Sequence, residues 1–209
     1  MPRPPILKIS EVFASVQGEG LRQGEATIFV RLAGCNLRCS FCDTKGSWKD
    51  GRDLCPEQVL DMIQKIRLSF PAGWVCLTGG EPLLQRVEGL VGRLKNEGFM
   101  VQVETNGTRY RSMAADWYTV SPKPRRYFYR PEYREKAKEV KVIVTRDLSL
   151  TRIRKLRQDF SLSTPLLLQP QSNRRWSIER GLRLLEEALK AGLDNIRLSA
   201  QLHKIFGLR

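Results

Sequence analysis

Short apolar runs alternate with longer amphipathic stretches along this chain, and this pattern predicts strands followed by helices. In residues 27–33 (TIFVRLA) the polarity alternates, so that Ile28 and Arg31 lie on opposite faces of a predicted strand. In residues 83–96, by contrast, apolar side chains recur at helical spacing up to a stop signal at Gly98. The chain therefore contains both element types in close succession.

The order of the elements predicts an α/β fold in which helices surround a parallel sheet or barrel of six or seven strands. In folds of this kind, functional residues gather at the carboxyl ends of the strands. Extended segments are predicted at residues 6–15, 27–33, 73–78, 99–104, 117–120, 139–144, 164–169 and 195–199. Helices are predicted from Pro56 onward and at residues 83–96, 150–158 and 177–191.

The length and composition predict one globular domain that spans residues 1–209. With 209 residues the chain is short for a complete eight-stranded barrel, and it shows no internal repeat or long linker. No apolar run approaches the roughly 20 residues that cross a bilayer, and the N-terminus lacks the features of a signal peptide. The sequence therefore predicts a cytoplasmic protein without a membrane anchor.

Positive charge is concentrated in one part of the chain. The net charge is +14, and residues 121–160 contain 13 Lys or Arg against 5 Asp or Glu. This excess is consistent with a nucleic-acid footprint, and also with a solvated basic face that meets an anionic substrate or electron donor. The second interpretation is favoured because no nucleic-acid-binding motif accompanies the charge, so direct nucleic-acid binding is not expected.

Three cysteines in the segment GCNLRCSFCD give the strongest chemical signal in the chain. Cys35, Cys39 and Cys42 have the spacing Cys-x₃-Cys-x₂-Cys, and three thiolates on one loop can hold three irons of a 4Fe–4S cluster while the fourth iron stays open. A closed zinc site needs four protein ligands, whereas Cys55 and Cys76 stand alone. An odd number of cysteines does not indicate a disulfide framework, and an oxygen-sensitive cluster needs a reducing compartment.

The cysteine spacing, with Phe41 before the last cysteine, resembles that of the radical S-adenosylmethionine (SAM) superfamily. In that superfamily SAM binds the open iron, and a reduced cluster cleaves it into methionine and a 5′-deoxyadenosyl radical. Five further segments resemble one family within it, the 7-carboxy-7-deazaguanine synthases. They are SEVFASVQGEG (10–20), CDT (42–44), TGGEP (78–82), ETNGT (104–108) and SPKP (121–124).

This resemblance implies a reaction, a fold and partners. The family converts 6-carboxy-5,6,7,8-tetrahydropterin to 7-carboxy-7-deazaguanine and releases ammonia, as a lyase of queuosine and 7-deazapurine biosynthesis that uses a 4Fe–4S cluster, SAM and Mg²⁺. The implied fold is an incomplete TIM-type barrel of about six parallel strands. The implied partners are the pterin substrate, a second copy of the chain in a homodimer, and an electron donor of the flavodoxin or ferredoxin type.

The resemblance also assigns site residues, position by position. The cluster ligands are Cys35, Cys39 and Cys42, and the magnesium ligand is Thr44. The residues assigned to SAM are Phe41, Cys42, Asp43, Gly80, Glu104, Ser121, Pro122, Lys123, Gln169, Pro170, Gln171 and Ser172. The residues assigned to the substrate are Val16, Gln17, Gly18, Arg31 and Thr78. A guanidinium suits the substrate carboxylate because it can form two parallel hydrogen bonds, and no residue is assigned as a general acid or base.

Several of these residues have simpler interpretations if the resemblance is set aside. Gly79 and Gly80 suit a tight strand-to-helix turn, Lys123 suits an exposed basic surface, and the Thr44 hydroxyl suits a loop contact. His203, the only histidine, is expected to be structural rather than catalytic.

Two other functions agree with parts of the sequence. A radical SAM enzyme that generates a glycyl radical on a partner protein has a similar length and cluster motif, but it lacks the SVQGEG segment. A non-catalytic iron–sulfur or nucleic-acid-binding protein is supported only by the net charge of +14.

Overall fold

The computed structural model describes residues 5–124 and 126–208, and their contacts divide them into two compact units. Unit 1 contains the described residues of 5–16, 25–105 and 109–118. Unit 2 contains residues 17–24 and 106–108 and the described residues of 119–208. A short segment that directly precedes the second strand of unit 1 therefore belongs to unit 2.

Unit 1 is built on five strands with mixed pairing. Its strands are β1 (Leu7–Val16), β2 (Ala26–Leu32), β3 (Arg52–Leu54), β4 (Trp74–Gly79) and β5 (Met100–Thr105). β1 pairs antiparallel with both β3 and β2, whereas β2, β4 and β5 pair in parallel. Because the carboxyl ends of the parallel strands meet at one edge, the cysteine loop after β2 and the two glycines that end the TGG segment lie at that edge.

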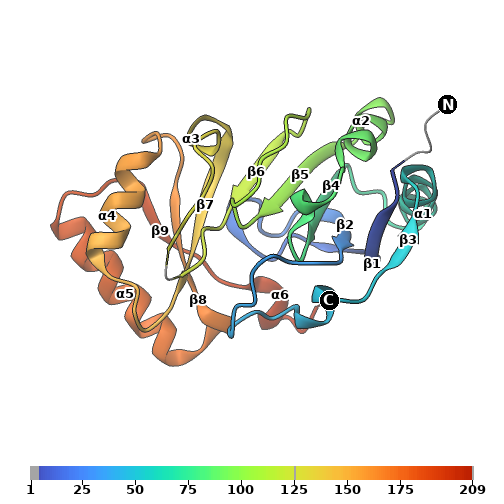
Figure 1. The fold of residues 1–209 in the computed structure, drawn as a ribbon. Helices are drawn as coiled ribbons and strands as arrows, with labels where there is room; N and C mark the ends of the chain where they lie inside the picture. Colours follow the sequence, from blue (N-terminus) through green and yellow to red (C-terminus); the bar gives the residue numbers. More distant parts are fainter. Residues whose placement is uncertain (1–4, 125, 209) are drawn as a thin grey trace. The chain divides into compact units, whose positions relative to one another are not determined.

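Two helices cover this sheet. α1 (Pro56–Ser69) begins as predicted, since proline occupies its first turn and Cys55 with Gln58 forms a capping box. α1 and α2 (Glu88–Asn96) contact each other, and their buried positions, such as Ile63 and Leu90, face the core. Figure 1 shows both helices beside β1 and β4.

The second predicted helix starts later than residue 83. Pro82–Leu84 forms a separate 3-10 turn, and the helix begins only at Glu88. The side chain of Gln85 accounts for the interruption, because it accepts from the Lys8 backbone N–H at 2.7 Å and donates to the Ala33 carbonyl at 2.8 Å. These contacts to distant strands leave the segment before the helix extended, which no local pattern could reveal.

Unit 2 contains the parallel strands β7 (Ala137–Val144), β8 (Leu166–Pro170) and β9 (Ile196–Leu198). α4 (Leu150–Asp159) and α5 (Arg175–Lys190) connect these strands and pack against each other at one face of the sheet (Figure 1). The short helices are α3 (Tyr133–Lys136) and α6 (Leu202–Ile205). β6 (Trp117–Val120) is shared between the two units, because its residues divide after Tyr118.

The strands and long helices occur close to the predicted ranges, and six of the strands described in residues 5–124 and 126–208 pair in parallel. The prediction missed β3, α3 and α6. Elements of three or four residues are too short to show a period, and long-range contacts stabilise them instead. For example, the Leu202 N–H at the start of α6 donates to the Gly18 carbonyl at 2.8 Å.

None of the helices in the described ranges is both long and apolar enough to span a membrane. The prediction that residues 1–209 form a single domain stays a prediction.

Candidate functional site

The three predicted cluster ligands lie on one loop that follows β2 in unit 1. The loop is closed at its base by a hydrogen bond of 2.8 Å from the Gly34 N–H to the Ser47 carbonyl. Within it, the Cys42 N–H donates to the Cys39 carbonyl at 3.1 Å, and the Leu37 N–H donates to the Cys35 sulfur at 3.4 Å. The backbone of the loop therefore forms a turn between Cys39 and Cys42.

The thiols themselves fit an iron–sulfur cluster. Cys35, Cys39 and Cys42 are half-buried and none forms a disulfide. Burial raises the pKa of the Cys35 thiol, and the nearby charges of Glu81, Cys39 and Cys42 raise that pKa further. Three sulfur donors that repel one another as thiolates, and that are partly open to a ligand, form the donor set of a cluster with one open iron.

The structure explains why glycine is required at positions 79 and 80. A Cβ on Gly80 would lie 2.0 Å from the Gly34 carbonyl oxygen, and one on Gly79 would lie 2.2 Å from the Leu32 oxygen. The Gly80 and Glu81 N–H groups donate to the Leu32 and Gly34 carbonyls at 3.0 and 2.8 Å. The absent side chains therefore let the TGG turn dock directly on the backbone that leads into the cysteine loop.

Glu81 is fully buried directly behind this turn. Its carboxylate accepts from the Leu83 N–H at 3.1 Å and from the Thr105 hydroxyl at 2.8 Å. These hydrogen bonds cap the turn Pro82–Leu84 and link β4 to β5. Glu81 therefore stabilises the turn that docks against the start of the cysteine loop.

Thr78 and Glu104 meet at the carboxyl ends of β4 and β5. The Thr78 hydroxyl donates to the Glu104 carboxylate at 2.9 Å, and Thr78 is buried. The sequence assigned Thr78 to the substrate and Glu104 to SAM. The structure thus brings one residue of each predicted set into direct contact.

Arg31 lies on the face of β2 opposite Ile28 and Val30, as predicted, and it is only partly buried. Its Nε donates to the Glu11 carboxylate at 2.6 Å, and its guanidinium carbon lies 5.4 Å from the centre of the Phe13 ring. Both partners come from β1, where Glu11 is the register partner of Arg31. The hydrogen bond to Glu11 uses Nε of the guanidinium, so the two Nη groups can donate hydrogen bonds to a carboxylate.

In unit 2, the predicted substrate residues Gln17 and Gly18 are buried in a segment pinned by α6. Besides the bond from Leu202, the Gly18 carbonyl accepts from the Gln23 side chain at 3.1 Å. A Cβ on Gly18 would lie 2.2 Å from Nδ1 of His203. His203 therefore packs against Gly18, and the two predicted substrate residues Gln17 and Gly18 are called the substrate wall below.

A polar cluster beside this segment was not predicted from the sequence. Glu19 forms an ion pair with Lys141 from β7, and its second oxygen accepts from the Gln201 amide at 2.7 Å. Burial would raise the pKa of Glu19, but Lys141 and the amides of Gln201 and Gln169 lower it to about 2. Glu19 belongs to the SVQGEG segment, which was the only signal in the sequence for this cluster.

The SAM-assigned residues of unit 2 lie directly after β6, at the end of β8 and in the turn after β8. The Ser121 hydroxyl donates to the Lys141 carbonyl at 2.9 Å and accepts from Lys123 at 2.7 Å. Ser172 has a left-handed backbone with φ of 52°, and its hydroxyl accepts from Lys204 at 3.0 Å. Both hydroxyls are held by a lysine, which makes each of these turns positively charged.

The other residues assigned to SAM or metal show fewer contacts. Thr44 lies 3.6 Å from the Cys42 sulfur through its hydroxyl, and its carbonyl accepts from Ser47. Phe41 is half-buried beside Cys42, whereas Asp43 is exposed.

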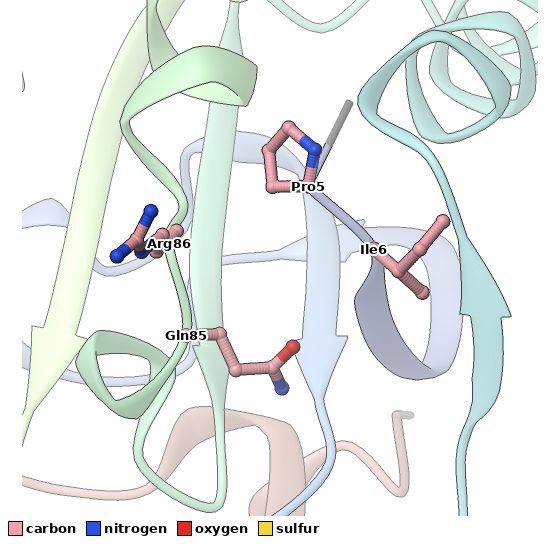
Figure 2. Close-up of a pocket in the computed structure, with 4 residues that line it drawn as sticks. All are labelled: Pro5, Ile6, Gln85 and Arg86. Carbon is pink, nitrogen blue, oxygen red and sulfur yellow. The ribbon is translucent and has the colours of Figure 1, made fainter. Parts of the chain in front are cut away.

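A hollow of about 420 Å³ in unit 1 is lined by none of the predicted site residues (Figure 2). It is lined by Pro5, Ile6, Gln85 and Arg86 in unit 1. None of its lining residues was predicted to bind a ligand, and Gln85 is engaged with the backbone of β1.

The fold and the cysteine loop have clear counterparts among known proteins. The family model of the Radical SAM superfamily matches residues 29–205. The 7-carboxy-7-deazaguanine synthase of Aquifex aeolicus is 34% identical over 213 residues, which cover 98% of this chain and 95% of that protein. The synthase of Synechocystis is 35% identical over 205 residues, with 96% and 93% covered. The crystal structure of QueE from Escherichia coli aligns with a TM-score of 0.79 and 29% identity over 95% of both chains.

The chain is therefore a member of the radical SAM superfamily, with the open, mostly parallel α/β fold of a partial TIM-type barrel. Within that superfamily it belongs to the family of the 7-carboxy-7-deazaguanine synthases. The family prediction is confirmed, and the comparisons do not favour a glycyl-radical activating enzyme or a non-catalytic binding protein.

Proposed function

We propose that this chain converts 6-carboxy-5,6,7,8-tetrahydropterin to 7-carboxy-7-deazaguanine and ammonia, as a radical SAM lyase. The observation that carries the proposal is the loop of Cys35, Cys39 and Cys42 docked on Gly79 and Gly80, in a chain that matches synthases of this name along nearly its whole length. When bound, the cluster and SAM supply the radical that starts the reaction. The protein positions the reactants and excludes water.

Each predicted group of residues has a distinct task in this scheme. Arg31 binds the substrate carboxylate through its Nη atoms, because Glu11 already fixes its Nε edge. Thr78 and Glu104 present a hydroxyl and a carboxylate at adjacent strand ends, where one contacts the substrate and the other the ribose of SAM. Gln17 and Gly18 offer amide and backbone groups to the donor and acceptor edge of the pterin ring.

The segments assigned to SAM in unit 2 are suited to its carboxylate. Lys123 is held by Ser121. Gln169–Ser172 covers the end of β8 and the start of the turn after it, where Ser172 is held by Lys204. Two ammonium groups at these turns attract an anionic group. The Gln169 side chain is buried, and its Oε1 has no partner among the residues that the structure describes, which leaves an acceptor for a bound ligand.

Magnesium, a partner subunit and an electron donor complete the proposal. Thr44 offers one hard oxygen, and Mg²⁺ would take its other ligands from the substrate carboxylate and water. Unit 2 contains 22 of the 36 basic residues and 10 of the 22 acidic ones. This excess suits a flavodoxin- or ferredoxin-type donor with an acidic surface. We further propose a homodimer in the cytoplasm.

The proposal is tested by anaerobic turnover. The cluster is reconstituted, dithionite, SAM, Mg²⁺ and 6-carboxytetrahydropterin are added, and the products are identified by mass spectrometry. We expect 7-carboxy-7-deazaguanine, at a rate that falls when Mg²⁺ is omitted. Accumulation of 5′-deoxyadenosine without this product would disprove the substrate assignment while keeping the superfamily. Light scattering that shows a monomer would disprove the dimer.

A further inference from the structure

Lys141 is an unusual residue in unit 2. It occupies the middle of β7 between Val140 and Val142, and it is only 6% exposed. Lysine is almost never buried to this extent without a paired acid. The lysine must therefore have a partner that compensates for the loss of water around its ammonium group.

The partner is Glu19, and both oxygens of its carboxylate accept a hydrogen bond. Glu19 Oε2 accepts from the Lys141 ammonium, and Oε1 accepts from the Gln201 amide. Burial alone would raise the pKa of Glu19, yet the opposing effects of Lys141, Gln201 and Gln169 hold this pKa at about 2. Glu19 is thus an ionised carboxylate with both oxygens fixed in place.

This carboxylate sits in the chain directly after the predicted substrate wall. The Glu19 N–H donates to Oε1 of Gln17 at 3.1 Å, so the wall and the ion pair are joined by one hydrogen bond. On the other side, the Leu21 N–H donates to the carboxylate of Glu139 at 2.6 Å. Glu139 and Lys141 are two residues apart on β7, so their side chains lie on the same face of that strand. Together they hold residues 19–21 against β7.

The same cluster ends in an acceptor that no described protein group satisfies. Gln169 is 1% exposed, and its Oε1 lacks a hydrogen-bond partner in residues 5–124 and 126–208. The Gln169 side chain also forms a hydrogen bond with the Glu19 carboxylate, which contributes to the low pKa of Glu19. A buried acceptor without a partner is rare in a folded protein unless a ligand or water completes it. Gln169 Oε1 is thus an acceptor beside the ion pair that a bound ligand or water can complete.

We infer that Lys141 is a positioning residue of the substrate site. Its ammonium group holds Glu19, and through Glu19 it fixes the orientation of Gln17 and Gly18 for the pterin. The inference rests on the proposed function, because that proposal assigns the wall to the substrate. Lys141 does not itself need to touch the substrate or SAM.

The test compares three variants of the reconstituted holoenzyme under anaerobic conditions. Lys141→Met removes the charge at a similar side-chain length, Lys141→Arg restores a cation, and Lys138→Met is the matched control, an exposed lysine on the same strand. We expect Lys141→Met to raise KM for 6-carboxytetrahydropterin by at least about tenfold, since breaking one half of a buried pair leaves an uncompensated charge. KM for SAM should change less than twofold. Lys141→Arg should recover most of the loss, and Lys138→Met should match the parent enzyme.

Hydrogen exchange of the same proteins supplies a readout that needs no turnover. Amides of residues 17–24 should exchange faster in Lys141→Met, while those of β8 keep their protection. A variant with lowered thermal stability but an unchanged KM would show a purely structural role and would overturn the inference. So would unchanged exchange in residues 17–24. Failure of the parent enzyme to convert the pterin would overturn the proposed function itself. This outcome is distinguishable from failure of the inference, because it is seen in the parent enzyme without any variant.

Discussion

The two units place their chemistry in different ways. In unit 1 the predicted cluster ligands are seven residues apart at most, and the turn Gly79–Gly80 docks on the backbone before them. In unit 2 the polar cluster joins Glu19 to Lys141, 122 residues further along the chain, and to Gln201, 182 residues further along. The predicted metal ligands come from one local motif, whereas the residues assigned to the substrate contact a network of residues from distant parts of the chain.

The ion pairs of the two units show the same contrast. Arg31 and Glu11 keep side-chain exposures of 18% and 26%, whereas Lys141 and Glu19 keep 7% and 15%. A partly solvated pair contributes little to stability and can change partners when a substrate carboxylate arrives. A more buried pair is costly to break, because each charge depends on the other. The first pair suits binding and the second suits fixed orientation.

The largest effect is expected from removing one cluster ligand. Cys39→Ala should lose the cluster and all product formation, because two thiolates cannot hold three irons of a cubic cluster. Iron analysis and mass spectrometry of the reaction measure this. The matched control is Cys55→Ala, which lies outside the loop at the start of α1 and should retain iron and turnover. Normal turnover by Cys39→Ala would contradict the scheme.

The next largest effect concerns the buried pair at low pH. The folded pKa of Glu19 is about 2, against 4.5 for the unfolded chain. Its contribution to stability is thus fully present above pH 4.5 and is lost as the pH falls through about 2. A shift of this size corresponds to roughly 3 kcal/mol. Urea unfolding at several pH values should show this acid-dependent loss in the parent chain.

The variant Lys141→Met provides the control for that measurement. Without the ammonium, burial raises the pKa of Glu19, so the variant should lose less stability between about pH 5 and pH 3 than the parent. Equal acid dependence in both proteins would show that the pair does not set the pKa of Glu19.

A moderate effect is expected from Gly80→Ala in unit 1. Its Cβ would meet backbone, the Gly34 carbonyl, and not a flexible side chain. The cysteine loop would have to move, at a cost of about 1–3 kcal/mol, and cluster occupancy should fall with it. Gly92→Ala is the matched control, because its Cβ meets nothing within 4 Å on helix α2. That change should stabilise the protein by about 0.5–1 kcal/mol, and thermal unfolding would distinguish the two.

The smallest effect on stability is expected from Arg31→Lys. The pair with Glu11 is partly exposed, so the free energy of unfolding should change by less than about 1 kcal/mol. Lysine cannot bind a carboxylate through two parallel bonds, so KM for the pterin should rise by about tenfold. Steady-state kinetics separate the two quantities. An unchanged KM would show that Arg31 does not bind the substrate carboxylate.

The amino-acid sequence by itself determined the family, the cysteine loop and the order of strands and helices. These features are local: a spacing of cysteines, a glycine pair at a strand end, and apolar periods such as residues 27–33. Family motifs also marked Arg31 and Thr78, whose contacts with Glu11 and Glu104 come from neighbouring strands. The partners of Arg31 and Thr78 lie on strands that the apolar pattern also predicted, whereas the assignment of both residues to the substrate stays a prediction.

Only the tertiary structure revealed why these residues are held as they are. Nothing local distinguishes Lys141 from other lysines in a basic region, and its role depends on Glu19 being brought to the same buried place. The late start of α2 and the position of α6 likewise depend on hydrogen bonds to distant backbone groups, from Gln85 and to Gly18. Burial turns an ordinary charge or amide into one that requires a specific partner. Burial is a property of the folded chain, and the local sequence around a residue does not reveal it.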